Sequence, residues 1–127
     1  MTTVLDTGGI SSLARSRERL QQMRDRGEWP PIVPSVVLTE ALTGDHRRDF
    51  HFNRLIKLCD VQSVDEIIAR HAALLRTAAA RQGISAADAI VVATADRPGG
   101  AVILTSDPLD LCALATHAVN PVTVART

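Results

Sequence analysis

The sequence predicts an α/β domain built on a central, mainly parallel sheet of about five strands. Length is the first observation, because 127 residues suffice for one domain with a buried core. Composition is the second: 46% of the residues are hydrophobic and 22% are charged, which excludes disordered and fibrous proteins. The third is the alternation of strand-like and helix-like segments, because strands separated by helices pair in parallel through right-handed crossovers. No repeat or linker interrupts this pattern, so we expect residues 1–127 to form one domain.

The first half of the chain predicts short strands between helices. An apolar run at residues 3–5 predicts the first strand, which stops at a turn over residues 6–9. The segment 29–34 supplies only a short strand, because its prolines cannot donate hydrogen bonds to a neighbouring strand. Ser35 follows in the position of a helix N-cap. Strands are expected at residues 3–5, 29–34 and 59–61, and helices at residues 10–26, 36–43 and 46–58.

A capping box predicts the longest helix of the second half. Ser63 and Glu66 have the required spacing, and Gly83 is expected to end the helix. Apolar residues recur at helical intervals along this segment and predict its buried face. The predicted face consists of Val64, Ile67, Ile68, Leu75 and Ala78.

The last part of the chain predicts two further helices and two strands. Residues 86–95 form a helix that is apolar nearly all round, which indicates that it is buried. Asp107 and Pro108 are expected as the N-cap and first residue of the final helix. The strands are expected at residues 101–105 and 121–124. Ligands of parallel sheets bind beyond the carboxyl ends of the strands, so the residues that follow each strand are the candidates for a site.

Charge is balanced overall but unevenly distributed. The chain has 14 Lys+Arg and 14 Asp+Glu, which at first argues against a nucleic-acid partner. Residues 14–57, however, hold nine basic and six acidic residues, whereas residues 84–127 hold two basic and four acidic ones. The early arginines are candidates for contacts with the phosphates of a nucleic acid, and a solvated surface is the alternative. The candidates are Arg15, Arg17, Arg19, Arg24, Arg47 and Arg48.

Several other classes of protein are excluded. No apolar run approaches the roughly 20 residues of a membrane span, and the first residues lack the basic and apolar stretches of a signal peptide. Cys59 and Cys112 lie far apart and form no C-x-x-C pair, which argues against a zinc ribbon or a thioredoxin-type site. The sequence is therefore interpreted as that of a cytoplasmic protein without membrane contact.

Four carboxylates stand out by their positions. Asp6 and Asp107 follow predicted strands, whereas Glu40 and Asp88 lie on apolar faces of predicted helices. Each has a structural alternative, namely a turn or N-cap for the aspartates and an exposed helix face for Glu40. Together they can converge at the carboxyl edge of the sheet, where their mutual repulsion calls for a cation. Mg²⁺ or Mn²⁺ suits such an oxygen-only set, and metal-assisted phosphoryl chemistry is the reaction class that follows.

Other acidic α/β sites do not fit the spacing. A haloacid-dehalogenase-type phosphatase needs Asp-x-Asp after the first strand, and Gly8 occupies the second of those positions. A response-regulator receiver needs a lysine after a late strand, and Lys57 is the only lysine. The glycine-rich fingerprints of nucleotide-binding proteins are absent as well.

Four motifs spread over nearly the whole chain carry a family resemblance. They are VLDT at residues 4–7, LTEAL at 38–42, SAADAIVVATA at 85–95 and ILTSD at 103–107. In this order they resemble the motifs of PIN-domain proteins of the VapC toxin type. The resemblance implies a PIN-like α/β/α sandwich and an endoribonuclease that depends on Mg²⁺ or Mn²⁺. It places Asp6, Glu40, Asp88 and Asp107 at the metal-binding and catalytic positions. A homodimer, and a small antitoxin protein that inhibits the nuclease, are implied as partners.

One position departs from the family's pattern. Family members commonly carry Ser or Asn two residues after the first Asp, where its side chain helps to order the metal site, and this chain has Gly8 there. Two hypotheses follow. The chain is either an active metal-dependent endoribonuclease or a catalytically weak PIN-like module that binds RNA or an antitoxin. A metal-dependent phosphatase is a third alternative.

Overall fold

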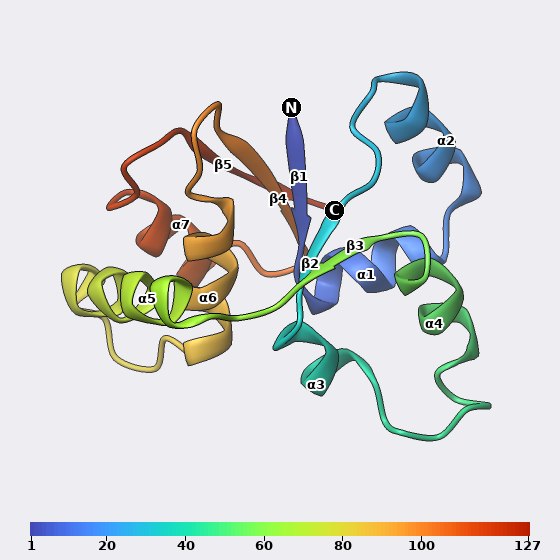
Figure 1. Cartoon of the computed structure of the whole chain (residues 1–127), viewed down its shortest axis with the longest axis horizontal. Coiled ribbons are helices and arrows are strands. Elements are labelled where there is room, and N and C mark those ends of the chain that lie inside the picture. The colour runs from blue at the N-terminus through green and yellow to red at the C-terminus, as the bar shows by residue number, and fades with distance from the viewer.

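A five-stranded parallel sheet forms the centre of the computed structural model, which describes residues 1–127. The strand order is β3-β2-β1-β4-β5, and every neighbouring pair is parallel (Figure 1). The strands are β1 (Thr2–Leu5), β2 (Ile32–Pro34), β3 (Asp60–Gln62), β4 (Ala101–Thr105) and β5 (Val122–Arg126). The predicted α/β class, the parallel sheet and its five strands are therefore confirmed.

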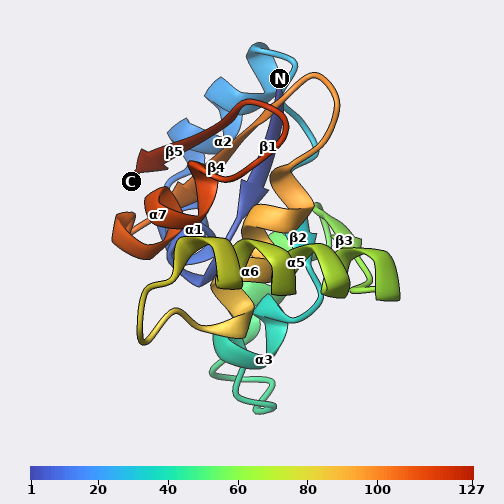
Figure 2. The ribbon, with the colours of Figure 1, turned by 90° about the vertical axis from the view of Figure 1, so that its left-hand side faces the viewer.

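Seven helices surround the sheet. They are α1 (Thr7–Ala14), α2 (Arg17–Asp25), α3 (Val37–Ala41), α4 (Phe50–Ile56), α5 (Glu66–Ala79), α6 (Ala86–Ala95) and α7 (Leu109–Ala115). Helices α5, α6 and α7 pack together on one side, and α1, α2 and α4 lie on the other (Figure 1). Figure 2 faces the first group and shows α5 crossing in front of α6. The predicted three-layer α/β/α arrangement is confirmed. None of these helices has the length and apolar character needed to cross a membrane.

The core lies on both faces of the two central strands. Val4 and Leu5 of β1 and Ile103 of β4 are completely buried, because a strand covered by helices on both sides directs successive side chains into two apolar layers. Helix α6 packs against the same strands, and its residues 91–95 are all buried, as its apolar sequence predicts. Burial of this kind contributes roughly 1.5–3 kcal/mol for each large aliphatic side chain.

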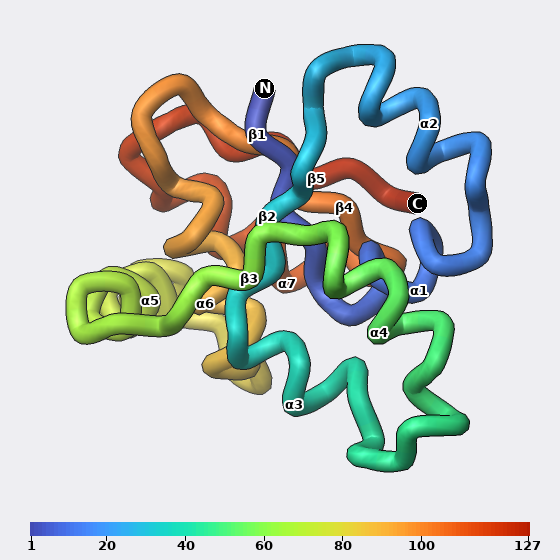
Figure 3. The backbone as a smooth tube through the Cα atoms, turned by 45° about the vertical axis from the view of Figure 1, so that its right-hand side comes forward, coloured from blue at the N-terminus to red at the C-terminus, as the bar shows by residue number.

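The single helix expected over residues 10–26 is wrong, because the segment forms α1 and α2. Ser16 separates them: its Oγ accepts a hydrogen bond from the backbone N–H of Arg19 and so begins a second helix. Figure 3 shows the backbone changing direction between α1 and α2. The turn expected at residues 6–9 is also wrong, since Asp6 caps α1 and Thr7 is already helical.

The capping box predicted for α5 is wrong as well. The N-cap is Asp65, whose Oδ1 accepts from the backbone N–H of Ile68 at 2.8 Å. A carboxylate accepts more strongly than a hydroxyl at a helix N-terminus, which carries partial positive charge. The predicted buried face is partly wrong too, because Ile67 is 78% exposed, whereas Leu75 is buried as expected.

Two other helices begin later than their predicted caps. Ser35 does not cap α3, whose first residue is Val37 and whose N-cap, Val36, makes no side-chain bond. Asp107 does not cap α7, because the N-cap is Pro108. Both differences leave a polar side chain free of a capping role at the carboxyl edge of the sheet.

Candidate active site

The four predicted carboxylates line one pocket of about 380 Å³ at the carboxyl edge of the sheet. Strands β1 and β4 are neighbours in register, with Leu5 opposite Leu104, so the residues that follow them meet at this edge. Helix α6 brings Asp88 of its first turn to the same place, and α3 brings Val37 and Glu40. The lining acids are Asp6 after β1, Glu40 in α3, Asp88 in α6 and Asp107 after β4.

Asp6 is held on both carboxylate oxygens. Its Oδ1 accepts from the backbone N–H of Gly9 at 2.8 Å, which is the N-cap bond of α1. Its Oδ2 accepts from Thr105 Oγ1 at 2.6 Å. Each carboxylate oxygen has a second lone-pair site, so these bonds orient Asp6 and leave it able to bind a further group in the pocket.

The surroundings of Asp88 disfavour its charged form. Partial burial raises the pKa of its carboxyl, and the nearby charges of Asp6, Asp110 and Glu40 raise it further, while the Ser85 hydroxyl that bonds its N–H acts in the opposite direction. The acids of the pocket therefore repel one another across it. A positive ion placed among them would relieve that repulsion.

Glu40 and Asp107 differ from what their sequence context predicts. Glu40 was expected on a buried apolar face, but α3 is only five residues long and Glu40 is exposed. Asp107 is exposed and its side chain caps no helix. Both therefore border the pocket with carboxylates that are free to turn.

The side chains that line the pocket offer only oxygen atoms as possible metal ligands. Besides the acids, its lining includes the hydroxyl groups of Thr7, Ser11, Thr105 and Ser106, and it includes no His or Cys. The acids are not drawn together into a preformed cluster, since no three His, Cys, Asp or Glu side chains surround a common ion position. Four like charges favour such separation.

Thr105 is a site residue that the sequence did not single out. It is completely buried, donates to Asp6 Oδ2, and accepts from the backbone N–H of Asp107 at 3.1 Å. It thereby ties the end of β4 to the end of β1. The sequence signal that could have predicted its role is its position: Thr105 has a hydroxyl group, ends the apolar strand β4 and precedes Asp107 by two residues.

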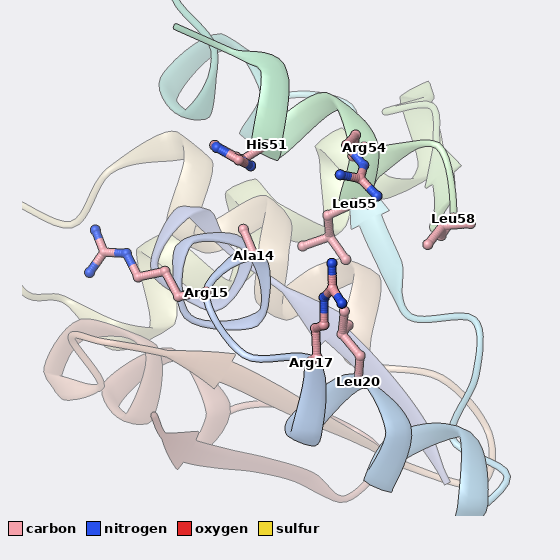
Figure 4. Close-up of a pocket in the computed structure, with 8 residues that line it drawn as sticks. All are labelled: Ala14, Arg15, Arg17, Leu20, His51, Arg54, Leu55 and Leu58. Carbon is pink, nitrogen blue, oxygen red and sulfur yellow. The ribbon is translucent and has the colours of Figure 1, made fainter.

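The predicted RNA-binding arginines are not gathered in one place. Arg15 and Arg17 line a separate pocket of about 330 Å³ between α1, α2 and α4, together with Arg54 and His51. Figure 4 shows the side chains of Arg17 and Arg54 approaching each other beside Leu55, while Arg15 points away. Apolar side chains complete the lining, namely Ala14, Leu20, Leu55 and Leu58. This pocket lies at the opposite end of α1 from the acids, a separation of about 12 Å for eight residues.

The other candidate arginines are engaged elsewhere or stand apart. Arg19 Nη1 donates to Ser12 Oγ at 2.6 Å, and Arg24 stacks over the ring of Trp29 at 4.7 Å. Arg47 and Arg48 are exposed in the segment that precedes α4.

Comparison with known proteins connects both the sequence and the fold to one family. The PIN domain family matches residues 3–114. No curated protein sequence matches the chain significantly.

Three solved structures share the fold at low sequence identity. VapBC2 from Rickettsia felis, bound to a promoter DNA fragment, matches with a TM-score of 0.72 at 14% identity, covering 100% of this chain and 99% of that one. DNA-bound VapBC from Salmonella typhimurium matches with a TM-score of 0.70 at 16% identity, covering 99% and 98%. A toxin–antitoxin complex from Klebsiella pneumoniae matches with a TM-score of 0.65 at 18% identity, covering 96% of each chain. At these identities the likeness establishes the fold.

Proposed function

This chain belongs to the PIN domain family, and from that premise we propose that it is a Mg²⁺- or Mn²⁺-dependent endoribonuclease of the VapC type, the toxin of a toxin–antitoxin pair. The observation that carries the proposal is the meeting of Asp6, Glu40, Asp88 and Asp107 in one pocket at the carboxyl edge of the sheet. Structural neighbours described as VapBC and as a toxin–antitoxin complex support the toxin role.

The donor set of the pocket fits a hard divalent cation. Its carboxylates and hydroxyls are the ligands that Mg²⁺ and Mn²⁺ prefer, and the nitrogen and sulfur ligands typical of zinc or copper sites are absent from its lining. The raised pKa of Asp88 reflects, after burial, the uncompensated charge of its neighbours. A divalent ion would lower the pKa of Asp88 and hold the set in its ionised form.

Each carboxylate has a role that its position suggests. When bound, the metal ion would activate water for in-line attack on phosphorus and offset the charge that develops on the leaving oxygen. Asp6 and Asp88 would hold the ion, and the Thr105 hydroxyl and the Gly9 N–H would keep Asp6 in one orientation. Glu40 and Asp107, exposed at the border of the pocket, would orient water or hold a second ion.

Substrate and partner recognition would come from outside the acidic pocket. Phosphodiester hydrolysis at carboxylates is indifferent to base identity, so specificity must come from other residues, and arginines would bind the RNA phosphates. Arg15 and Arg17, which line a pocket with Arg54, are the strongest candidates. A homodimer and a small antitoxin protein complete the proposal, and co-expression with that antitoxin should give a complex that no longer cleaves RNA.

RNA cleavage by active-site variants tests the proposal. The purified chain is incubated with structured RNA and Mg²⁺ or Mn²⁺, next to Asp6→Asn and Asp25→Asn. Asp25 is the matched control because it is an exposed aspartate of α2 whose only side-chain partner is Gln21. We expect the wild type and Asp25→Asn to cleave. Asp6→Asn should lose about 100-fold or more in rate, because even groups that only orient metal ligands commonly contribute 10- to 100-fold. Equal cleavage by Asp6→Asn would refute the assignment.

The second candidate is a PIN-like module that binds RNA or an antitoxin and cleaves poorly. It is favoured by the separation of the carboxylates, which form no preassembled ion site. Mn²⁺ titration calorimetry distinguishes the two, because only the nuclease should bind Mn²⁺ in a manner that Asp6→Asn and Asp88→Asn abolish.

A further inference from the structure

Gly8 and Ser106 lie against each other beside the four carboxylates. A Cβ built on Gly8 would lie 2.3 Å from Ser106 Oγ and 2.6 Å from the Ser106 backbone nitrogen. The hydroxyl could rotate away from such a Cβ, but the backbone nitrogen could not. Gly8 lies in the first turn of α1 without a positive φ. It is therefore the absence of a side chain, and not the freedom of the backbone, that this position requires.

Ser106 is held in place from both sides. Thr105, the residue before it, donates to Asp6, and Asp107, the residue after it, donates its N–H to Thr105 Oγ1. The loop between β4 and α7 is thus tied to the end of β1, and Ser106 cannot withdraw from Gly8 without loosening Asp6.

The Ser106 hydroxyl has no partner within the chain. The hydrogen bonds of its loop run through Thr105 and Asp107, and Ser106 Oγ takes part in none of them. The side chain is exposed and lines the acidic pocket together with all four carboxylates. A hydroxyl among carboxylates can donate one hydrogen bond and accept two. The backbone of Ser106 can lie this close to residue 8 only because that residue is glycine.

We propose that the Ser106 hydroxyl is a positioning group of the metal site: it hydrogen-bonds to water held among the carboxylates. Gly8, which has no side chain, leaves the space that Ser106 needs. The proposal rests on the proposed function and deepens it. Divalent cations such as Mg²⁺ keep several waters when protein carboxylates bind them. Groups that hydrogen-bond around a metal site, without touching the ion, commonly change its affinity 10- to 100-fold.

Mn²⁺ affinity is the readout, because it does not depend on cleavage. Calorimetric titrations compare the wild type with Ser106→Ala, Ser106→Thr and Ser63→Ala. Ser63 is the matched control, an exposed serine between β3 and α5 that also makes no side-chain hydrogen bond. We expect Ser106→Ala to bind Mn²⁺ about 10-fold more weakly, Ser106→Thr to retain the wild-type affinity because it keeps a hydroxyl, and Ser63→Ala to match the wild type. Urea midpoints without metal are expected to agree among all four proteins.

A Gly8→Ala variant tests the other half of the proposal. Its Cβ would displace the Ser106 backbone, so we expect it to weaken Mn²⁺ binding at least as much as Ser106→Ala does. Wild-type affinity in either Ser106→Ala or Gly8→Ala would overturn the inference while leaving the nuclease proposal intact. Absence of Asp6-dependent Mn²⁺ binding in the wild type would overturn both.

Discussion

The carboxylate of Asp96, whose side chain is buried, ties three segments of the chain together. It follows α6, and its side chain is only 1% exposed. The backbone N–H groups of Val119 and Asn120 donate to it from the loop before β5, and His71 Nε2 donates from α5 at 2.6 Å. Burial alone would raise the pKa of Asp96, but these hydrogen bonds together hold it below the ordinary value of 3.8.

The pH dependence of stability tests this role. A carboxyl whose pKa is lowered by folding stabilises the protein above the unfolded value and loses that contribution as the pH falls through the folded value. We expect Asp96→Asn to lower the free energy of unfolding by about 1–3 kcal/mol at pH 7. The difference in this free energy between wild type and variant should become smaller below pH 3.8, where wild-type Asp96 takes up a proton. Urea unfolding at pH 7, 5 and 3 measures both effects. Asp60→Asn, an exposed aspartate of β3, should show neither.

At the residue scale, the sequence predicted the four acids that line this pocket but not the groups that hold Asp6. Asp6 and Asp107 were predictable because parallel strands end at one edge of a sheet. Thr105 was not, since its bond to Asp6 joins residues 99 positions apart. Glu40 was assigned to a buried face because spacing along a helix does not reveal that α3 ends after five residues.

Among the helices, α5 ends at a residue poorly suited to its backbone. Ala80 follows the last helical residue with φ 51°, in the left-handed region. That conformation costs roughly 1–2 kcal/mol for a residue with a Cβ and little for glycine, which helices prefer at such ends. The chain places Gly83 three residues later, where the sequence predicted the end of the helix.

Glycine substitutions at two positions of α5 should act in opposite directions. Ala80→Gly removes the strained Cβ, so we expect the free energy of unfolding to rise by about 0.5–1 kcal/mol. Ala73→Gly, in the exposed middle of the same helix, should lower it by about 1 kcal/mol. Urea midpoints of the two variants measure the difference, and a loss of stability in Ala80→Gly would contradict the assignment of strain.

Element boundaries were the least predictable feature of the fold. Strands β1 and β4 and the apolar helix α6 were placed correctly because their signal is an apolar run with several buried residues. The position of a helix N-cap depends on one hydrogen bond. Two residues that could form this bond often lie close together in the sequence, as Ser63 and Asp65 do before α5. The outcome is decided by which oxygen reaches the free N–H groups, and sequence alone does not contain that distance.

Across the whole molecule, acidic and basic pockets lie at opposite ends of α1. The four acids line the pocket at its beginning, whereas Arg15 and Arg17 line the pocket at its end. This polarity agrees with the uneven charge of the sequence and accounts for a net charge of zero in a protein proposed to bind RNA. An RNA strand that reaches both pockets would place its phosphates on the arginines and its scissile bond among the acids.

The salt dependence of RNA binding tests that arrangement. In an Asp6→Asn background that prevents cleavage, we expect Arg15→Gln with Arg17→Gln to weaken binding and to reduce the slope of log affinity against log salt by about 1.4, the value for two lost contacts to single-stranded RNA. Fluorescence anisotropy over a range of salt concentrations measures the slope. Arg70→Gln with Arg76→Gln, two exposed arginines of α5, is the matched control. An unchanged slope in the first pair would place the RNA elsewhere.

The bond between Thr105 and Asp6 also decides when the acidic pocket can exist. It joins residues 99 positions apart in the sequence, and β4, which carries Thr105, is the fourth of the five strands. During synthesis the ribosome releases Asp6 early and Thr105 near the end, so a nascent chain has no complete pocket until most of its length has emerged. Any message cut short before β4 yields a chain without the site. The proposed nuclease activity would therefore require that β4 has already been synthesised.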